Sequence, residues 1–180
     1  MENKIINYKN FEWYVLEVKE ESLVLLMKDL LSEKVVRDIC DDTSMYSDNH
    51  IAHIKNIDEK YNWETSYVRE VLNDKFLENY LDRNDLVKMN DDYVRLLKLE
   101  ELKWDTDIFK SNDWYSTMTK MGPSNVAFVY SDGHASGTYA GYSWMAVRPV
   151  IEVKKSALEV KKMTVAQICD TLGYEVEIIK

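Results

Sequence analysis

The chain has 180 residues, of which 46 % are hydrophobic and 12 % aromatic, which is enough to bury a core as one domain, or as one domain with a small appendage. This composition excludes an intrinsically disordered protein. The net charge of −9 disfavours direct nucleic-acid binding, because that affinity depends on Lys and Arg side chains that displace counterions from phosphates.

The negative charge is concentrated between residues 38 and 92, where fourteen acidic and six basic side chains give a local charge of −8. One interpretation is a contact surface for a basic protein partner, including a protein that itself binds nucleic acid. The other is a solvated acidic face that only confers solubility. The first interpretation makes four acidic residues candidate contacts: Asp41, Asp42, Asp48 and Asp58.

No segment reaches the roughly 18 apolar residues of a membrane-spanning helix, and no signal-peptide core follows Met1. We expect a cytoplasmic protein that does not contact membranes. Cys40 and Cys169 lie far apart and lack C-x-x-C or zinc-type spacing, so free thiols are expected and no cofactor is predicted.

The N-terminal part predicts an antiparallel strand pair. The apolar runs 11 to 18 and 23 to 28 are separated by a polar connection of hairpin length. The second run is almost entirely apolar, which predicts a strand covered on both faces. Residues 38 to 62 are polar and predict a long connection.

Helical periodicity begins at Trp63, with Thr65 or Ser66 as the N-terminal cap. Asn73-Asp74 is expected to interrupt the helix, with Asp74 capping a second short helix. The positions expected to face the core are Val68, Val71, Leu72, Phe76 and Tyr80.

A strand is expected over residues 93 to 97. The segment from Asn125 to Lys154 organises the C-terminal half. Its apolar runs, 126 to 130 and 144 to 153, flank a stretch with three of the five glycines, which predicts a hairpin or small meander. Asp132-Gly133 is the strongest turn signal, because a type I′ turn needs positive φ at both central residues. Residues 114 to 119 are expected to pair with this hairpin.

The C-terminal residues predict a separate small motif. Thr164 and Gln167 form a capping box, Gly173 suits the C-terminal cap of a helix, and residues 175 to 179 alternate like a strand. We therefore expect a main domain over residues 1 to 155 and a helix-strand appendage over 156 to 180. The sequence does not decide whether the appendage docks on its own chain or on another.

Three motifs occur in order along the chain. The first is the hairpin W-x-V-L at residues 13 to 16, and the second is W-E-x-S-x-x-R-x-x-L-N-x-x-F-L at residues 63 to 77. The third is A-x-V-x-S-D-G at residues 127 to 133, followed by V-R-P-V-I at 147 to 151. Together they resemble an uncharacterised bacterial and phage domain of unknown function with a C-type-lectin-like fold, over roughly residues 8 to 153. Relatives of that fold include sulfatase-modifying enzymes and variable receptor-binding proteins of phages.

The resemblance implies an α+β domain, with short helices on a twisted, mostly antiparallel sheet and ligands on the loop-rich face near the C-terminal strands. It implies no activity. Formylglycine-generating relatives use paired active-site cysteines, whereas Cys40 and Cys169 lie in different parts of this chain. Calcium-dependent lectins use E-P-N or Q-P-D with W-N-D, and this chain carries only Asn112-Asp113-Trp114, so a calcium sugar site is not expected.

Two histidines, His50 and His53, would share a face if they lay on a helix, and Asp48 or Asp58 would then supply an oxygen ligand for a metal. The surrounding sequence is typical of a loop, and no third ligand has suitable spacing. We therefore predict surface histidines and no metal site.

The residues Asp132, His134 and Ser136 allow a Ser-His-Asp arrangement on paper, but the sequence has no G-x-S-x-G elbow, and a polar turn is the favoured interpretation. No catalytic residue is predicted. Pro149 predicts an edge strand or a bulge. Arg148 is expected to fix the helix to the sheet, paired with a carboxylate such as Glu64.

Aromatic residues alternate with glycine and serine between residues 136 and 144, a composition typical of binding loops. The alternative for Trp144 is a place in the core. The candidate contact residues on this side of the domain are Trp114, His134, Tyr139, Tyr142 and Trp144.

The sequence thus favours a non-enzymatic protein-binding module encoded by a phage or mobile element. A specific hypothesis is an acidic anti-CRISPR inhibitor, whose surface occupies the basic nucleic-acid channel of a host defence nuclease. One alternative is a carbohydrate or small-ligand lectin with a pocket lined by Trp114, Tyr139 and Trp144, and another is an enzyme of the formylglycine-generating type. The oligomeric state stays open.

Overall fold

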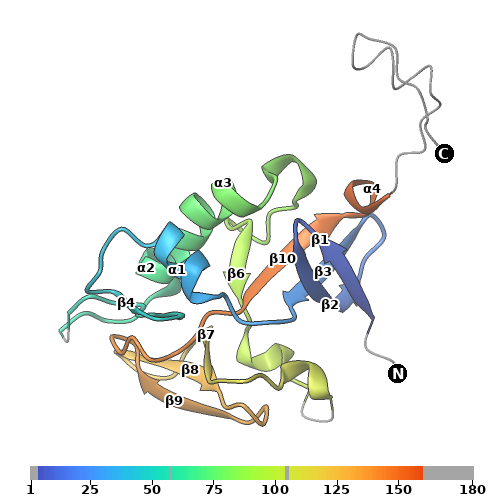
Figure 1. Ribbon diagram of the computed structural model, residues 1–180. Helices are drawn as coiled ribbons and strands as arrows, with labels where there is room; N and C mark the ends of the chain where they lie inside the picture. Colours follow the sequence, from blue (N-terminus) through green and yellow to red (C-terminus); the bar gives the residue numbers. More distant parts are fainter. Residues whose placement is uncertain (1–3, 57, 104–105, 160–180) are drawn as a thin grey trace, which may run out of the picture.

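The computed structural model describes residues 4–56, 58–103 and 106–159 as an α+β arrangement (Figure 1). A five-stranded antiparallel sheet has the order β1 (Ile5–Tyr8), β2 (Phe11–Val18), β3 (Ser22–Met27), β10 (Pro149–Lys154) and β6 (Val94–Leu96). A second sheet contains β7 (Tyr115–Lys120), β8 (Asn125–Val129) and β9 (Ala135–Tyr139), and a two-stranded ribbon contains β4 (Tyr46–Ser47) and β5 (His50–Ile51).

The helices are short. The α-helices are α1 (Glu33–Ile39), α2 (Tyr67–Val71), α3 (Leu77–Tyr80) and α4 (Lys155–Leu158), and a π-turn, η2 (Leu72–Phe76), joins α2 to α3. The 3-10 turns are η1 (Trp63–Thr65), η3 (Arg83–Asp85), η4 (Leu99–Glu101) and η5 (Asp107–Phe109). Among the residues in the described ranges, no helix has the length and apolar character needed to cross a membrane.

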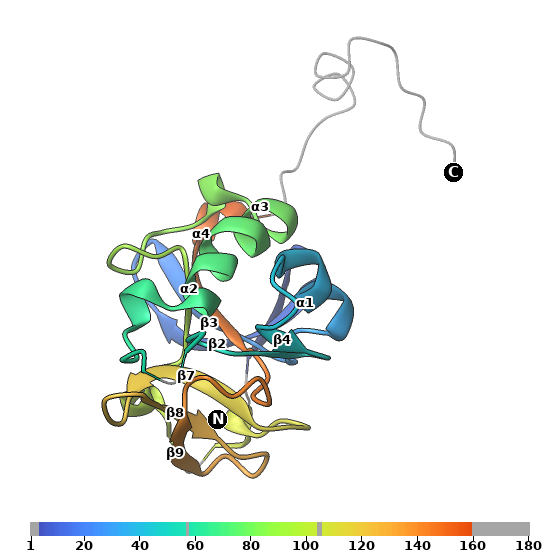
Figure 2. The same ribbon diagram turned by 90° about the vertical axis from the view of Figure 1, so that its left-hand side faces the viewer.

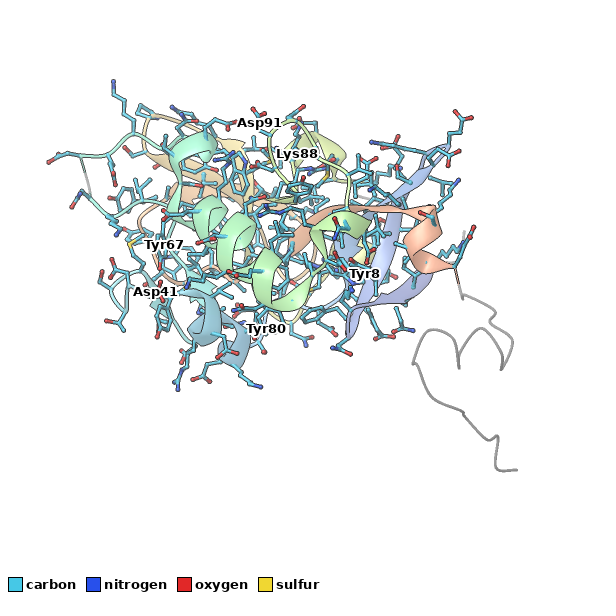
Figure 3. The ribbon with its side chains drawn as sticks, turned by 90° about the horizontal axis from the view of Figure 1, so that it is seen from above. Tyr8, Asp41, Tyr67, Tyr80, Lys88 and Asp91 are labelled. Carbon is cyan, nitrogen blue, oxygen red and sulfur yellow. The ribbon has the colours of Figure 1, made fainter. Side chains whose placement is uncertain are left out.

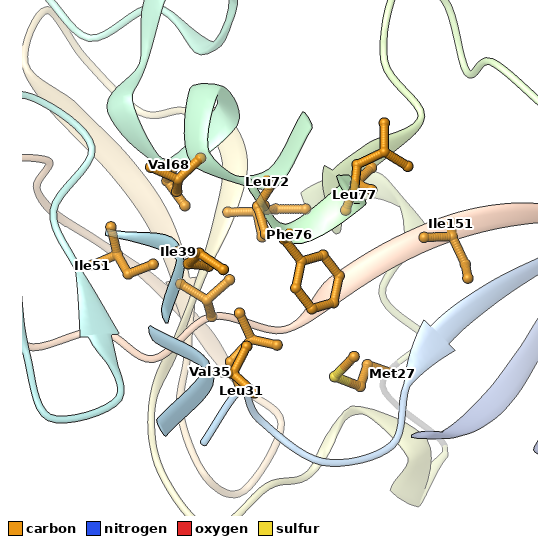
Figure 4. Packing of buried hydrophobic residues seen from close by; sticks show 14 of the residues in the cluster. Met27, Leu31, Val35, Ile39, Ile51, Val68, Leu72, Phe76, Leu77 and Ile151 are labelled. Carbon is orange, nitrogen blue, oxygen red and sulfur yellow. The ribbon is translucent and has the colours of Figure 1, made fainter. Parts of the chain in front are cut away.

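The five-stranded sheet is buried on both faces. On one face Leu25 and Ile151 belong to a core shared with α1, α2 and Phe76 (Figure 4). On the other face Leu26 belongs to a core shared with Val129 of β8. Figures 1 and 2 show the helices α1 to α3 and the sheet β7–β8–β9 on opposite sides of the molecule. The fold therefore presents a helical side and a β side.

The N-terminal hairpin is confirmed as β2 and β3. Every residue of β3 is buried, as expected for a strand covered on both faces. The sequence analysis did not predict α1, which follows directly. Ser32 caps this helix by accepting a hydrogen bond from the Val35 amide at 3.4 Å, and Val36 and Ile39 lie on its buried side.

The helical segment after Trp63 is confirmed, and Ser66 caps α2. The expected break at Asn73-Asp74 is wrong, because the chain continues through the π-turn. Asn73 links the turn to β6: its Nδ2 donates to Val94 O at 2.6 Å, and its Oδ1 accepts from the amides of Tyr93 (2.8 Å) and Val94 (3.0 Å). The wider π-turn at this position lets the Asn73 side chain hydrogen-bond the backbone of β6 instead of ending the helix.

The strand at residues 93 to 97 is confirmed as β6, and the C-terminal hairpin as β8 and β9. The type I′ turn expected at Asp132-Gly133 is wrong, because Gly133 has φ +94° whereas Asp132 does not have a positive φ. The apolar run 144 to 153 leaves this sheet, because β10 lies between β3 and β6. The expectation of an edge strand or bulge at Pro149 is wrong. Pro149 is the first residue of a central strand, which proline tolerates.

Most of the predicted appendage lies outside the described residues. The described chain ends in α4 and Glu159, so the capping box, Cys169 and the alternating segment lie outside the described residues. Cys40 is a buried free thiol.

Candidate functional site

Six aromatic rings form a continuous cluster on the β side, here called the aromatic patch: Trp114, Phe128, Tyr130, Tyr139, Tyr142 and Trp144. Neighbouring ring centroids lie 4.8 to 5.8 Å apart, in T-shaped or tilted geometry. Phe128 is buried at the base, whereas Trp114 and Tyr142 are 39 % and 48 % exposed. The patch therefore combines a fixed base with an accessible rim.

Backbone hydrogen bonds hold the loop of the aromatic patch against the second sheet. The Ala146 amide donates to Trp114 O at 2.9 Å, and the Ser116 amide donates to Ala146 O at 3.0 Å. On the other side of the loop, the His53 amide donates to Ala140 O at 2.8 Å. The segment that carries Tyr142 is thus anchored at both ends.

The structure brings together four of the predicted contact residues, Trp114, Tyr139, Tyr142 and Trp144, as neighbours in one cluster. The other aromatic members, Phe128 and Tyr130, were not predicted as contacts, because the apolar run 126 to 130 was interpreted only as a strand of the hairpin. Phe128 lies in β8, and Tyr130 comes directly after the last residue of that strand. Their spacing of two residues is the signal that could have placed both rings on one face.

His134 does not belong to this cluster. It lies at the turn between β8 and β9, where its Nδ1 is 3.2 Å from Asp132 Oδ2. Hydrogen bonding from the His134 amide lowers the pKa of the Asp132 carboxyl. These contacts fit the polar turn that was expected here.

Large apolar side chains at the surface gather on the β side. The described residues contain five of them, and three belong to the second sheet or its connections: Trp114, Met121 and Tyr142. The other two, Ile5 and Val18, lie in β1 and β2. The β side is therefore the richest apolar surface on the described part of the chain.

The acidic segment 38 to 92 is partly used inside the fold. Asp92 is buried and accepts hydrogen bonds from Trp63 Nε1 and Arg69 Nε, both at 2.7 Å. Asp38 accepts from the Tyr80 hydroxyl at 2.6 Å. Asp92 is therefore used inside the fold, whereas Asp38 stays exposed while it accepts this hydrogen bond.

The four candidate acids lie in three different environments. Asp41 and Asp42 follow α1, and Asp42 is 2.9 Å from Lys55 Nζ. Asp48 forms the turn between β4 and β5 at φ +52°. Asp58 lies in the loop before Tyr61. Its carboxylate lies close enough to Tyr139 to contribute, after burial and together with Glu59, to raising the pKa of that hydroxyl.

In Figure 3, Asp41 and Asp91 lie on different sides of α2. The acidic residues that remain exposed, such as Asp74 and Glu78, are spread over the helical side. This distribution gives a diffuse negative field and no single concentrated contact.

His50 and His53 do not share a helix face, because His50 lies in β5 and His53 follows that strand outside any helix. His50 Nε2 is 2.9 Å from Asp113 Oδ2. The prediction of a surface histidine is wrong for His53, which is fully buried. Its ring lies edge-on to Tyr61 at 5.3 Å, and both ring nitrogens lack a partner among the described residues. Burial lowers the pKa of His53 to about 3. In the described part of the chain, no three His, Cys, Asp or Glu residues are grouped to hold a metal.

A cleft of about 710 Å³ lies close to the aromatic patch, since its lining includes Asp113, the residue before Trp114. Its walls come from the chain after β3, the turn of the β4–β5 ribbon and the segment after η5. They carry mainly polar side chains: Tyr14, Lys28, Asp29, Ser32, Glu33, Asp48, Asn49, Lys110, Ser111, Asn112 and Asp113.

Arg148 links two walls of this cleft. It is fully buried, and it donates to Met27 O and Lys28 O, both at 2.8 Å. Its Nη1 lies 3.5 Å from Lys110 O. The expected pair with Glu64 is wrong, since Glu64 lies 3.6 Å from Arg69. The hydrogen-bond acceptors for the Arg148 guanidinium are therefore backbone carbonyls and not a carboxylate.

Comparisons with protein-family models, with curated proteins and with solved structures gave no match for this chain.

Proposed function

We propose that this protein is a non-enzymatic protein-binding module and that the aromatic patch is its contact surface. The observation that carries the proposal is the continuous cluster in which Trp114 and Tyr142 remain 39 % and 48 % exposed. Trp and Tyr are enriched among the residues that dominate the energetics of protein interfaces, because they offer large contact areas for little conformational entropy.

The anchored loop supports the same proposal. Gly141 and Ser143 alternate with Tyr142 and Trp144, and hydrogen bonds fix the loop at Ala140 and Ala146. A surface that is ordered before binding loses less conformational entropy when a partner docks. An enzymatic role based on a reactive thiol has less support, because burial raises the pKa of Cys40 to about 11.

Affinity enrichment from a candidate host tests the proposal. The baits are the wild type, the double variant Trp114→Ala/Tyr142→Ala, and Val18→Ala as a control. Val18 is 64 % exposed and lies on the other sheet. We expect a protein that the wild type and the control enrich and the double variant loses, with binding then reproduced from purified components. Equal enrichment by the double variant would contradict the proposal.

A basic partner is compatible with the charge of −9. In the inhibitor hypothesis, the exposed carboxylates of the helical side, including Asp74 and Glu78, would steer a nucleic-acid-binding nuclease toward this protein. Steering predicts an association rate that falls with added salt, whereas the dissociation rate is set by the aromatic patch.

The cleft supports a second candidate function, the binding of a carbohydrate or another small polar ligand. The amides of Asn49 and Asn112 and the carboxylates of Asp48 and Asp113 line one connected space. This differs from the expected pocket of Trp114, Tyr139 and Trp144. A glycan-array screen of the wild type and of Asn49→Ala/Asn112→Ala tests it: signals that the variant loses would support a ligand site in the cleft, and a blank array would oppose it.

A further inference from the structure

The strand β9 forms the outer edge of the second sheet, which has the order β7–β8–β9 (Figures 1 and 2). At one end of the β8–β9 ladder the Tyr130 amide donates to His134 O at 2.7 Å, and at the other end the Ala140 amide donates to Ser124 O at 2.9 Å. Hydrogen-bonded and non-bonded pairs alternate in an antiparallel ladder. Between these ends, three residues of β9 therefore direct their amides and carbonyls away from β8: Ala135, Gly137 and Tyr139.

These outward groups are largely unused. The Tyr142 amide donates to Tyr139 O at 3.2 Å. Across residues 4–56, 58–103 and 106–159, no other hydrogen bond engages the outward backbone groups of Ala135, Gly137 or Tyr139. Gly137 lies in the middle of the strand and is exposed.

The edge also lacks the features that normally prevent strand addition. Proteins protect free edges with charged side chains, proline or bulges. The sequence of β9 is A-S-G-T-Y, which contains no charge and no proline, and its register with β8 runs without a bulge. By contrast, β7 and β8 pair with a register shift. No charged side chain, proline or bulge within β9 therefore prevents an extended segment from pairing with this strand.

The surroundings of β9 favour a basic occupant over a second copy of the chain. The chain carrying Asp58 and Glu59 is tied to the end of β9, because Ser124 Oγ donates to Glu59 O at 2.7 Å and the Ala140 amide donates to Ser124 O. Two copies at −9 each would repel one another, whereas Lys or Arg side chains would be attracted to this end of the edge.

Apolar contacts are available along the same edge. The side chain of Met121 lies beside Gly137, since a Cβ at that glycine would be 3.3 Å from Met121 Cβ. Met121 is 51 % exposed, and the exposed ring of Tyr142 contacts Tyr139 at the end of the strand next to Ala140. Exposed aromatic rings also attract cationic side chains.

We infer that β9 binds an extended, Lys- or Arg-containing segment of a partner protein by strand addition, next to the aromatic patch. This inference rests on the proposed protein-binding function and specifies its partner. Backbone hydrogen bonds to Gly137 and its outward neighbours supply affinity, and alternate side chains of the segment contact Met121 and Tyr142.

A random peptide library of about twelve residues, displayed on phage and panned on the full chain, supplies the probe. The test variant is Gly137→Pro, which removes an outward amide that β8 does not use, so the sheet tolerates it. The matched control is Gly137→Ala, which adds the same Cβ contact with Met121 and keeps the amide.

We expect selected peptides rich in Lys and Arg whose affinity falls at least about tenfold with Gly137→Pro and changes less than about threefold with Gly137→Ala. Synthetic peptides with N-methyl groups at alternate positions provide a test that does not depend on the fold of a variant. One set of positions should abolish binding, and the other should leave it unchanged.

Selected peptides that bind Gly137→Pro and the wild type equally, or that tolerate N-methylation at both sets of positions, would overturn the inference. If the same peptides are lost with Trp114→Ala/Tyr142→Ala, strand addition is wrong while the protein-binding function stands. If neither variant affects them, both proposals fail. Concentration-dependent dimerisation of the wild type that Gly137→Pro removes would assign the edge to a second copy instead.

Discussion

Replacing Arg148 tests whether guanidinium geometry stabilises the fold around the cleft. Its Nε and Nη2 donate to Met27 O and Lys28 O at 2.8 Å, and its Nη1 lies 3.5 Å from Lys110 O and from the Tyr115 hydroxyl. Burial lowers the pKa of this guanidinium, so the site is unfavourable for a charge unless these acceptors are in place. A lysine ammonium is a point charge that cannot reach acceptors on both walls at once.

The size of the effect follows from the two short hydrogen bonds. A hydrogen bond to a charged group contributes about 1.5 to 3 kcal/mol. Arg148→Lys keeps the charge and satisfies one of the two carbonyls, so we expect a loss of about 2 kcal/mol in the free energy of unfolding. Arg148→Ala leaves both carbonyls unpaired and opens a cavity, and we expect it to lose about 4 kcal/mol.

Urea unfolding followed by tryptophan fluorescence measures these losses. The control is Arg37→Lys, because Arg37 is 63 % exposed and pairs with Glu33 on the surface of α1. Exposed pairs contribute little, so this control should stay within about 0.5 kcal/mol of the wild type. An Arg148→Lys variant as stable as this control would refute the role given to the guanidinium fork.

Three further predictions use the same unfolding assay. Asn73→Ala removes the hydrogen bonds to β6 and should lower the free energy of unfolding by about 2 to 3 kcal/mol. Asn73→Asp keeps an acceptor for the two amides, so we expect about half of that loss. Equal losses for the two variants would contradict the role of the Asn73 side-chain oxygen. The pKa of His53 is about 3 in the fold against an ordinary value of 6.5, so only the unfolded chain binds a proton between these values. Stability should therefore fall by about 2 kcal/mol from pH 7 to pH 5, and a steeper or equal fall in His53→Phe would argue against this cause. Tyr142→Ala should cost less than about 1 kcal/mol, because half of the ring is exposed; a larger loss would make Tyr142 a structural residue.

The sequence predicted the secondary-structure elements whose residues carry a clear pattern within a short stretch of the chain. The apolar runs of β2 and β3, the strand β6 and the glycine turn before β9 each depend on neighbours in sequence. The helix α1 was missed because it has only seven residues and a mostly charged exposed side. The π-turn could not be predicted, because Asn73 satisfies backbone groups of Tyr93 and Val94 some twenty residues away.

The partners of Arg148 could not be predicted by searching the sequence for an oppositely charged side chain. An acid was expected, but the acceptors are main-chain carbonyls about 120 residues away, which no side-chain pattern reveals. The sequence also could not show which strands pair with the run 144 to 153, because that pairing depends on the order of all the strands in the five-stranded sheet.

Local composition identified residues that the structure brings together in one cluster. Alternation of aromatic residues with glycine and serine pointed to Tyr139, Tyr142 and Trp144, and the structure places them together with Trp114. The acidic segment was less informative, because a count of charges does not separate an internal partner such as Asp92 from an exposed carboxylate.

The most direct test of the central proposal compares the two sides of the molecule in one binding measurement. A partner recovered with the wild type is titrated against Trp114→Ala/Tyr142→Ala on the β side and against Asp74→Lys/Glu78→Lys on the helical side. We predict that the aromatic variant raises Kd at least about tenfold through faster dissociation, while the charge variant changes Kd less and mainly slows association. A large rise in Kd with the charge variant, and none with the aromatic variant, would contradict the proposal that the aromatic patch is the contact surface.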